Sequence, residues 1–193
     1  MFFGFSSFHD LRACIARDWT PKIGDPGFTG WLTVLSYLVC LWLAVLVLRR
    51  RPAGAARKLW LVIAGLMAFL ALNKQLDLQT ALTAAGRCVA RAQGWYDSRY
   101  IVQLAFIAGL VLGAVLALIW ATKALRGHMS HNRLALLGLA VLCCFVLVRA
   151  AGFHHVDRLI SADFADIKFN FWLENAGLVL IALNALMLLR RGR

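Results

Sequence analysis

Residues 30–48 read GWLTVLSYLVCLWLAVLVL and are followed at once by three arginines, Arg49, Arg50 and Arg51. The stretch holds 19 residues and no charged side chain. An α-helix rises about 1.5 Å per residue and the hydrocarbon core of a bilayer is about 30 Å thick, so this stretch is typical of a membrane-spanning helix. It predicts that the chain is embedded in a membrane.

Four further apolar stretches of similar length predict a bundle of five transmembrane helices. The predicted spans are residues 30–48, about 59–82, 100–122, 134–153 and 169–189. Of the 193 residues, 62% are hydrophobic and 16% are charged, whereas a soluble domain has about 45–50% apolar and about 25% charged residues. We therefore expect an all-α, multi-pass membrane helix bundle that forms a single integral membrane domain over residues 1–193. This composition excludes a cytosolic enzyme, and nucleic acid is not an expected partner despite the net charge of +12.

The distribution of charge predicts the orientation of the bundle. The connections after the first and third predicted spans and the C-terminus together hold eleven Lys and Arg and no acidic residue. All nine Asp and Glu lie on the other side. Because short cytoplasmic loops are enriched in Lys and Arg, the N-terminus is predicted outside and the C-terminus in the cytoplasm. The short loops and the predominance of arginine favour a bacterial inner membrane, a plasma membrane with a periplasm outside it.

Residues 1–29 predict an amphipathic segment that lies on the outer surface. Its apolar residues recur at helical spacing: Phe8, Leu11, Ile15 and Trp19. Ser7 and Asp10 have the spacing of a capping box, and Pro21 and the following glycines end the predicted helix. Such a helix is expected to lie in the membrane interface. An unordered tail is the alternative.

The five cysteines divide according to this topology. Cys14 and Cys88 lie on the predicted outer side, where an oxidising compartment permits a disulfide between them. The sequence leaves open whether they are bridged. The other three lie within predicted spans, where a free cysteine behaves as a small apolar residue: Cys40, Cys143 and Cys144.

Polar residues gather at the outer ends of the second, fourth and fifth predicted spans. Ionisable residues are costly inside a bilayer, so each is a candidate for a functional site. The candidate ligand-binding residues are Asn73, Lys74, Asp77, Arg149, His154, His155, Asp157, Asn170 and Glu174. The two cations and two acids that fall within the predicted spans sum to zero charge, as a site of low dielectric requires.

This set predicts a binding site for an anionic head group or a small polar ligand in the outer half of the bilayer. Lys74 and Arg149 would contact the anion, and the acids of the second and fifth spans would balance them. His154, His155 and Asp157 also supply the ligand types of a zinc, iron or manganese site, although no HExxH motif is present. No cofactor is specified by the sequence.

Two other functions remain open. If the polar residues pair with one another, they hold the helices together, and the chain is a structural or accessory subunit of a membrane complex. If a carboxylate or imidazole acts as a general acid or base, the chain is an intramembrane hydrolase or transferase acting on lipid. Membrane lipids are expected partners. Gly109 and Gly113 form a GxxxG motif that is compatible with a membrane protein partner or a second copy of the chain.

Overall fold

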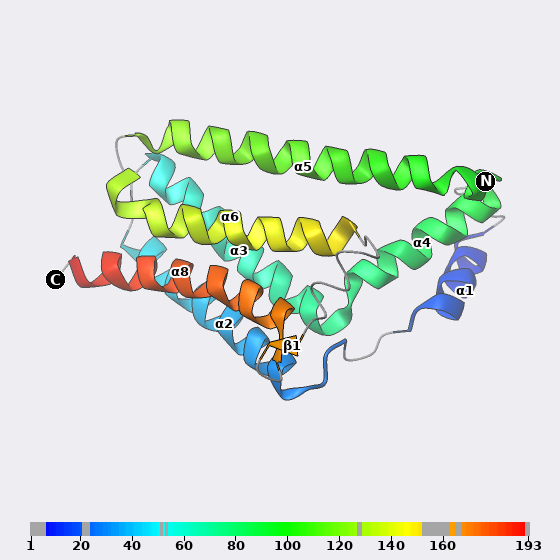
Figure 1. Ribbon diagram of the computed structural model, residues 1–193, viewed down its shortest axis with the longest axis horizontal. Coiled ribbons are helices and arrows are strands. Elements are labelled where there is room, and N and C mark those ends of the chain that lie inside the picture. The colour runs from blue at the N-terminus through cyan, green and yellow to red at the C-terminus, as the bar shows by residue number, and fades with distance from the viewer. Residues whose placement is uncertain are drawn as a thin grey trace.

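The computed structural model describes residues 7–20, 24–50, 52, 54–126, 129–151, 163–164 and 167–191. Within them the chain forms seven α-helices, one 3-10 helix and one antiparallel pair of two-residue strands (Figure 1). The all-α class is therefore confirmed. The elements are α1 (Phe8–Asp18), α2 (Phe28–Arg49), α3 (Gly54–Leu76), α4 (Leu78–Ala92), η1 (Tyr96–Ser98), α5 (Arg99–Ala124), α6 (Met129–Ala151), β1 (Asp163–Phe164), β2 (Ile167–Lys168) and α8 (Phe169–Arg191).

Four of these helices, α2, α3, α5 and α8, are long and apolar enough to cross a membrane. The apolar part of α6 is shorter and covers His131–Leu147. The predicted spans at 30–48, 100–122 and 169–189 lie inside α2, α5 and α8. Helices of this length and composition are what a multi-pass membrane protein requires.

The predicted second span is wrong at its outer end. Residues 59–82 were expected to form one helix, but α3 ends at Leu76 and Asp77 adopts the left-handed conformation, with φ 47° and ψ 49°. Aspartate tolerates this region better than most L-residues because its short side chain bonds locally. Here the Asp77 carboxylate accepts a 2.7 Å hydrogen bond from the Thr80 hydroxyl. The turn directs α4, which the sequence did not predict, away from the bundle toward α1 (Figure 1).

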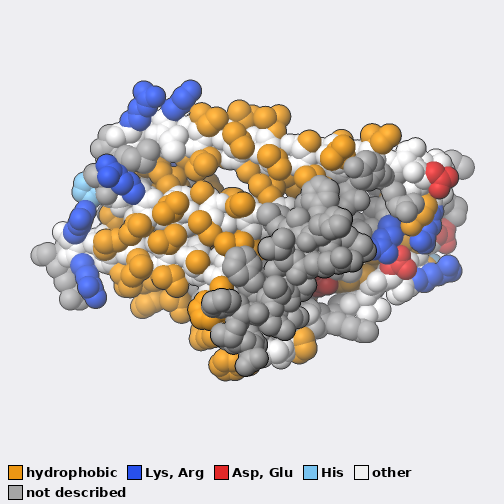
Figure 2. Space-filling view, viewed as in Figure 1, with side chains coloured by type: hydrophobic (Ala, Val, Ile, Leu, Met, Phe, Trp, Pro, Cys, Tyr) orange, Lys and Arg blue, Asp and Glu red, His pale blue; other side chains and the backbone are white. Residues whose placement is uncertain are grey.

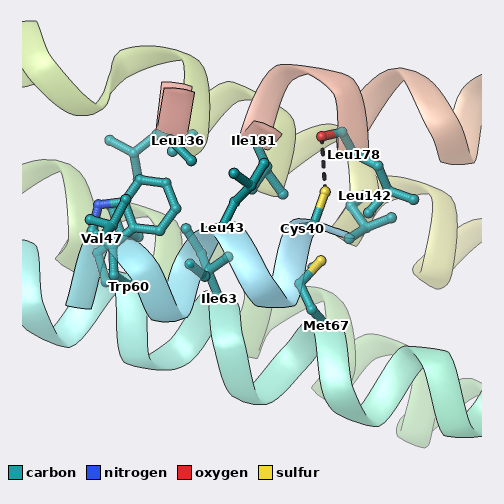
Figure 3. Packing of buried hydrophobic residues seen from close by; sticks show 14 of the residues in the cluster. Cys40, Leu43, Val47, Trp60, Ile63, Met67, Leu136, Leu142, Leu178 and Ile181 are labelled. Carbon is teal, nitrogen blue, oxygen red and sulfur yellow. Dashed lines mark hydrogen bonds between the residues drawn. The ribbon is translucent and has the colours of Figure 1, made fainter. Parts of the chain in front are cut away.

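The core lies between α2, α3, α6 and α8. Figure 3 shows side chains from these four helices pointing toward one another, with Ile63 of α3 facing Leu43 of α2 and Met67 of α3 facing Cys40. The Cys40 thiol donates to the Leu178 carbonyl at 3.3 Å. The largest fully buried side chains in this core are Trp60, Tyr37, Ile63, Met67, Leu142, Leu178 and Ile181. They fix the four helices as one packed unit.

Helix α5 stands apart from this core. It runs the length of the molecule beside α6 (Figure 1), but none of its side chains from 104 to 120 is buried. Ala121 and the residue that follows the helix, Leu125, are buried against the bundle. Over most of its length α5 therefore presents an apolar surface to its surroundings.

Charged side chains divide between the two ends of the molecule. One end, which we call the basic end, holds the last turns of α2, α5 and α8 and the first turns of α3 and α6 (Figure 1). Among the described residues it carries Lys and Arg but no Asp or Glu (Figure 2). The described acids lie toward the opposite end, which we call the acidic end. This separation matches the division of charge that the sequence shows.

A disulfide joins Cys14 of α1 to Cys88 of α4 at the acidic end, which answers the question that the sequence left open. The first turn of α1 has the predicted cap, since the Ser7 hydroxyl accepts from the Asp10 backbone N–H at 3.3 Å. An exposed ion pair between Arg87 and Asp18, 3.8 Å apart, also links the two helices.

Replacing Cys14 by alanine is expected to release α1 from α4. The bridge closes a 74-residue separation, and removing a native disulfide of this kind costs about 2–5 kcal/mol of local stability. Hydrogen exchange followed by mass spectrometry should show amides of α1 exchanging more than about tenfold faster, while α2 and α3 are unchanged. Cys144→Ala, which removes an exposed free thiol, is the control. Unchanged protection of α1 would show that packing alone holds it.

Candidate functional site

Four of the nine predicted site residues line one cavity at the acidic end of the core. They are Asn73, Lys74, Asp77 and Glu174, and the remaining lining residues are Tyr37, Leu70, Phe145 and Val146. The cavity has a volume of about 40 Å³, and a water molecule needs roughly 10–15 Å³ on this measure. It has room for a few water-sized molecules and is far smaller than a lipid head group.

Glu174 lies at the centre of this site and is only 3% exposed. One carboxylate oxygen, Oε1, accepts a hydrogen bond from the Tyr37 hydroxyl at 2.9 Å. The other, Oε2, accepts from the Lys74 ammonium at 3.0 Å. The three side chains come from α8, α2 and α3, so a single buried carboxylate ties three core helices together.

Lys74 has a second acidic partner that the sequence did not indicate. Asp25, in the turn before α2, places its Oδ2 atom 3.6 Å from the Lys74 ammonium. Among the described side chains, Lys74 therefore contacts two acids, Asp25 and Glu174, and a third acid, Asp77, lines the same cavity. The predicted charge balance is not reached among these residues, because the side chain of Arg149 lies outside the described part of the chain.

The turn at Asp77 packs closely against the segment before α2. The backbone N–H of Gly24 donates to the Gln75 carbonyl at 2.7 Å. A Cβ atom at Gly24 would lie 3.1 Å from the Cβ of Asp77 and from the Lys74 carbonyl oxygen. Both polar atoms of the Gln75 side chain are shielded from solvent and have no hydrogen-bond partner among the described residues.

The other predicted site residues are placed only in part. Arg149 and Asn170 lie near the adjacent ends of α6 and α8, and Arg149 follows cavity-lining Phe145 by one helical turn, but their side chains are outside the described residues. The predicted metal ligands His154, His155 and Asp157 also lie outside them. Within the described part of the chain, no group of three His, Cys, Asp or Glu side chains is arranged to hold a metal ion.

Tyr37, like Asp25, is a residue of this site that sequence reasoning missed. A tyrosine hydroxyl that is buried needs a hydrogen-bond partner, and Tyr37 is a phenol within an otherwise apolar predicted span, which was the available signal. The structure gives it a partner 137 residues away.

Other buried polar side chains also join helices to one another. Asn175 donates to the Thr33 hydroxyl at 3.2 Å, between α8 and α2. Toward the basic end, the Asn184 amide accepts from the Ala135 N–H at 3.2 Å and donates to the His131 carbonyl at 3.0 Å. The Trp60 indole donates to Asn132 at 3.0 Å. Each of these contacts links two different helices of the core.

Comparison with known proteins does not assign the chain to a family. No family model, no curated protein and no solved structure matches the chain. The function is therefore argued from the described contacts. These contacts are chemically suited to holding helices in a fixed register within a medium of low dielectric.

Proposed function

We propose that this chain is a structural or accessory subunit of a complex in a bacterial inner membrane. The exposure of α5 carries the proposal, because a helix of 26 residues with no buried side chain from 104 to 120 contributes little to its own bundle. A Cβ atom added at Gly109 or at Gly113 would meet nothing within 4 Å. Small residues at such positions let the backbone of a second helix approach closely within a bilayer.

The pairing of the buried polar groups supports the same function. An enzyme or a binding site would leave Glu174 accessible to its substrate or ligand, whereas a structural subunit would pair it. Glu174 has protein donors on both oxygens. The helix-to-helix bonds of Asn175 and Asn184 favour the same interpretation.

The proposed topology has five crossings, made by α2, α3, α5, α6 and α8. The acidic end lies outside and the basic end in the cytoplasm, so the N-terminus is outside and the C-terminus inside. Two observations support this orientation: the Lys and Arg side chains at the basic end, and the Cys14–Cys88 disulfide at the acidic end. In this arrangement α1 lies on the outer surface as an interfacial helix beside α4.

Photo-crosslinking in intact membranes tests whether α5 meets a protein. A photoreactive residue is placed at Leu116 of α5 or, as a matched control, at Trp42 of α2. The two positions are 56% and 61% exposed and lie at a similar depth along their helices. We expect a discrete protein adduct from position 116 and lipid adducts alone from position 42. Lipid adducts alone from both positions would overturn the accessory-subunit proposal.

A ligand site at the acidic end is the second candidate function. It is favoured by the convergence of Asn73, Lys74, Asp77 and Glu174 on one cavity, and by the shielded amide of Gln75. The cavity of about 40 Å³ is lined by one described cation, Lys74, and two acids, Asp77 and Glu174, and Lys74 is also paired with Asp25. A few waters or a small neutral or cationic molecule therefore suit the described residues better than an anion. The anionic head group that the sequence predicts would need Arg149, His154 and His155 to supply its contacts.

A further inference from the structure

The basic end carries a groove between α2 and α8 that the proposed function does not use. It has a volume of about 480 Å³ and is lined by three leucines and three arginines: Leu46, Arg49, Arg50, Leu186, Leu189 and Arg190. All three arginines are exposed. A second hollow of about 310 Å³ shares Arg50 and Leu189 with the first and continues it toward α3 and α6.

The groove is apolar at one level and basic at the next. Leu46 of α2 and Arg50, the C-cap of α2, are four residues apart, and Leu186 and Arg190 are four apart on α8, so each pair lies along one side of its helix. Both pairs line the groove. A four-residue step is about 6 Å along a helix axis. The leucines therefore lie at the level of the hydrocarbon, and the arginines lie where the helices end.

No described acidic side chain balances the positive charge of the groove. Among the described residues at the basic end there is no Asp or Glu, and the loops and terminus on this side contain none in the sequence. The guanidinium fork of arginine matches the geometry of a phosphate and binds it through paired, charge-assisted hydrogen bonds. Basic pockets between membrane helices on the cytoplasmic side are suited to anionic lipid head groups.

We propose that this groove binds an anionic phospholipid. Its phosphodiester lies among Arg49, Arg50 and Arg190, and one acyl chain follows the leucines of α2 and α8. A zwitterionic lipid fits less well, because its ammonium group would be repelled by the same arginines. Binding here does not require a partner on α5, so it can hold or fail independently of the proposed subunit role.

Native mass spectrometry of the delipidated full chain in mild detergent tests this site. The protein is titrated with phosphatidylglycerol, with phosphatidylethanolamine of the same acyl chains, and with inorganic phosphate. We expect phosphatidylglycerol to bind best, and the triple variant R49Q/R50Q/R190Q to bind it about tenfold more weakly or worse. The matched control, R57Q/K123Q/R126Q, removes three charges from the same end without touching either hollow and should bind as the unchanged protein does.

A second variant separates the acyl-chain contact from the charge. Leu186→Trp fills the groove with all three arginines in place, and because Leu186 is 39% exposed, the change lies outside the core. We expect it to weaken phosphatidylglycerol binding while its melting temperature stays unchanged. Unweakened binding by Leu186→Trp would overturn the groove site, as would an equal loss in the two triple variants. Phosphate binding as tightly as the lipid would show a phosphate site without lipid recognition.

Discussion

Replacing Glu174 by alanine is expected to lower the free energy of unfolding by about 3–5 kcal/mol, the usual cost of breaking a buried ion pair. The cost arises because the change removes the acceptor for both the Tyr37 hydroxyl and the Lys74 ammonium. The Lys74 side chain is only 12% exposed, and its remaining partner, Asp25, is 3.6 Å away and 42% exposed. The charge of Lys74 would therefore be poorly compensated within the bundle. Chemical unfolding in detergent micelles measures the effect.

Two further variants identify the cause of the stability loss in Glu174→Ala. Asp97→Ala removes an exposed acid at the same end of the molecule and should change stability by less than about 0.5 kcal/mol. Lys74→Met combined with Glu174→Leu replaces the charged pair with apolar side chains and should recover most of the lost stability. Equal effects of Glu174→Ala and Asp97→Ala would show that Glu174 is solvated. A double variant no more stable than Glu174→Ala would show that the loss comes from packing.

The position of three candidate spans was predictable from the sequence because each is predominantly apolar over its whole length. A helix in hydrocarbon must be apolar for about 20 residues, and residues 30–48, 100–122 and 169–189 meet that demand independently of their neighbours. The break at Asp77 was not predictable in the same way. Leucines continue on both sides of it, at Leu76 and Leu78, and the left-handed turn depends on local bonding by the Asp77 side chain and on the close approach of Gly24.

The position of the candidate site was predictable from the sequence, but the hydrogen-bond and ion-pair partners of its residues were not. Asn73 and Asp77 were both predicted as site residues at the end of the second span, and both line the cavity. The contacts of Asp25 with Lys74 and of Tyr37 with Glu174 were not identifiable, because the sequence places Asp25 in a Gly-Asp-Pro-Gly turn and Tyr37 in an apolar span. Both contacts depend on how α2 packs against α3 and α8, which a single sequence does not specify. The same packing decides that Glu174 joins helices.

The close contact of two glycines at the crossing of two core helices predicts a second large effect. At the crossing of α6 and α8, a Cβ atom on Gly138 would lie 2.6 Å from the Gly177 carbonyl oxygen and 2.9 Å from Cγ1 of Ile181. The contact is reciprocal, since a Cβ on Gly177 would lie 2.9 Å from the Gly138 carbonyl oxygen. Backbone atoms cannot move aside as a side-chain tip can, so any larger residue must push the two helices apart.

Gly138→Leu is therefore expected to cost about 3 kcal/mol or more, and Gly138→Ala about 1–3 kcal/mol, as overpacking of a close interface does. The loss should be in the packing of α6 against α8, and it should appear as faster hydrogen exchange in both helices. Gly65→Leu is the matched control, because Gly65 is exposed on α3 and an added Cβ meets nothing within 4 Å. If Gly138→Leu were as stable as Gly65→Leu, the two helices could not cross at these glycines.

Since α8 also carries Glu174 to its partners on α2 and α3, Gly138→Leu should weaken the ion pair between Glu174 and Lys74 as well. Combining it with Glu174→Ala should then cost less than the two single changes added together.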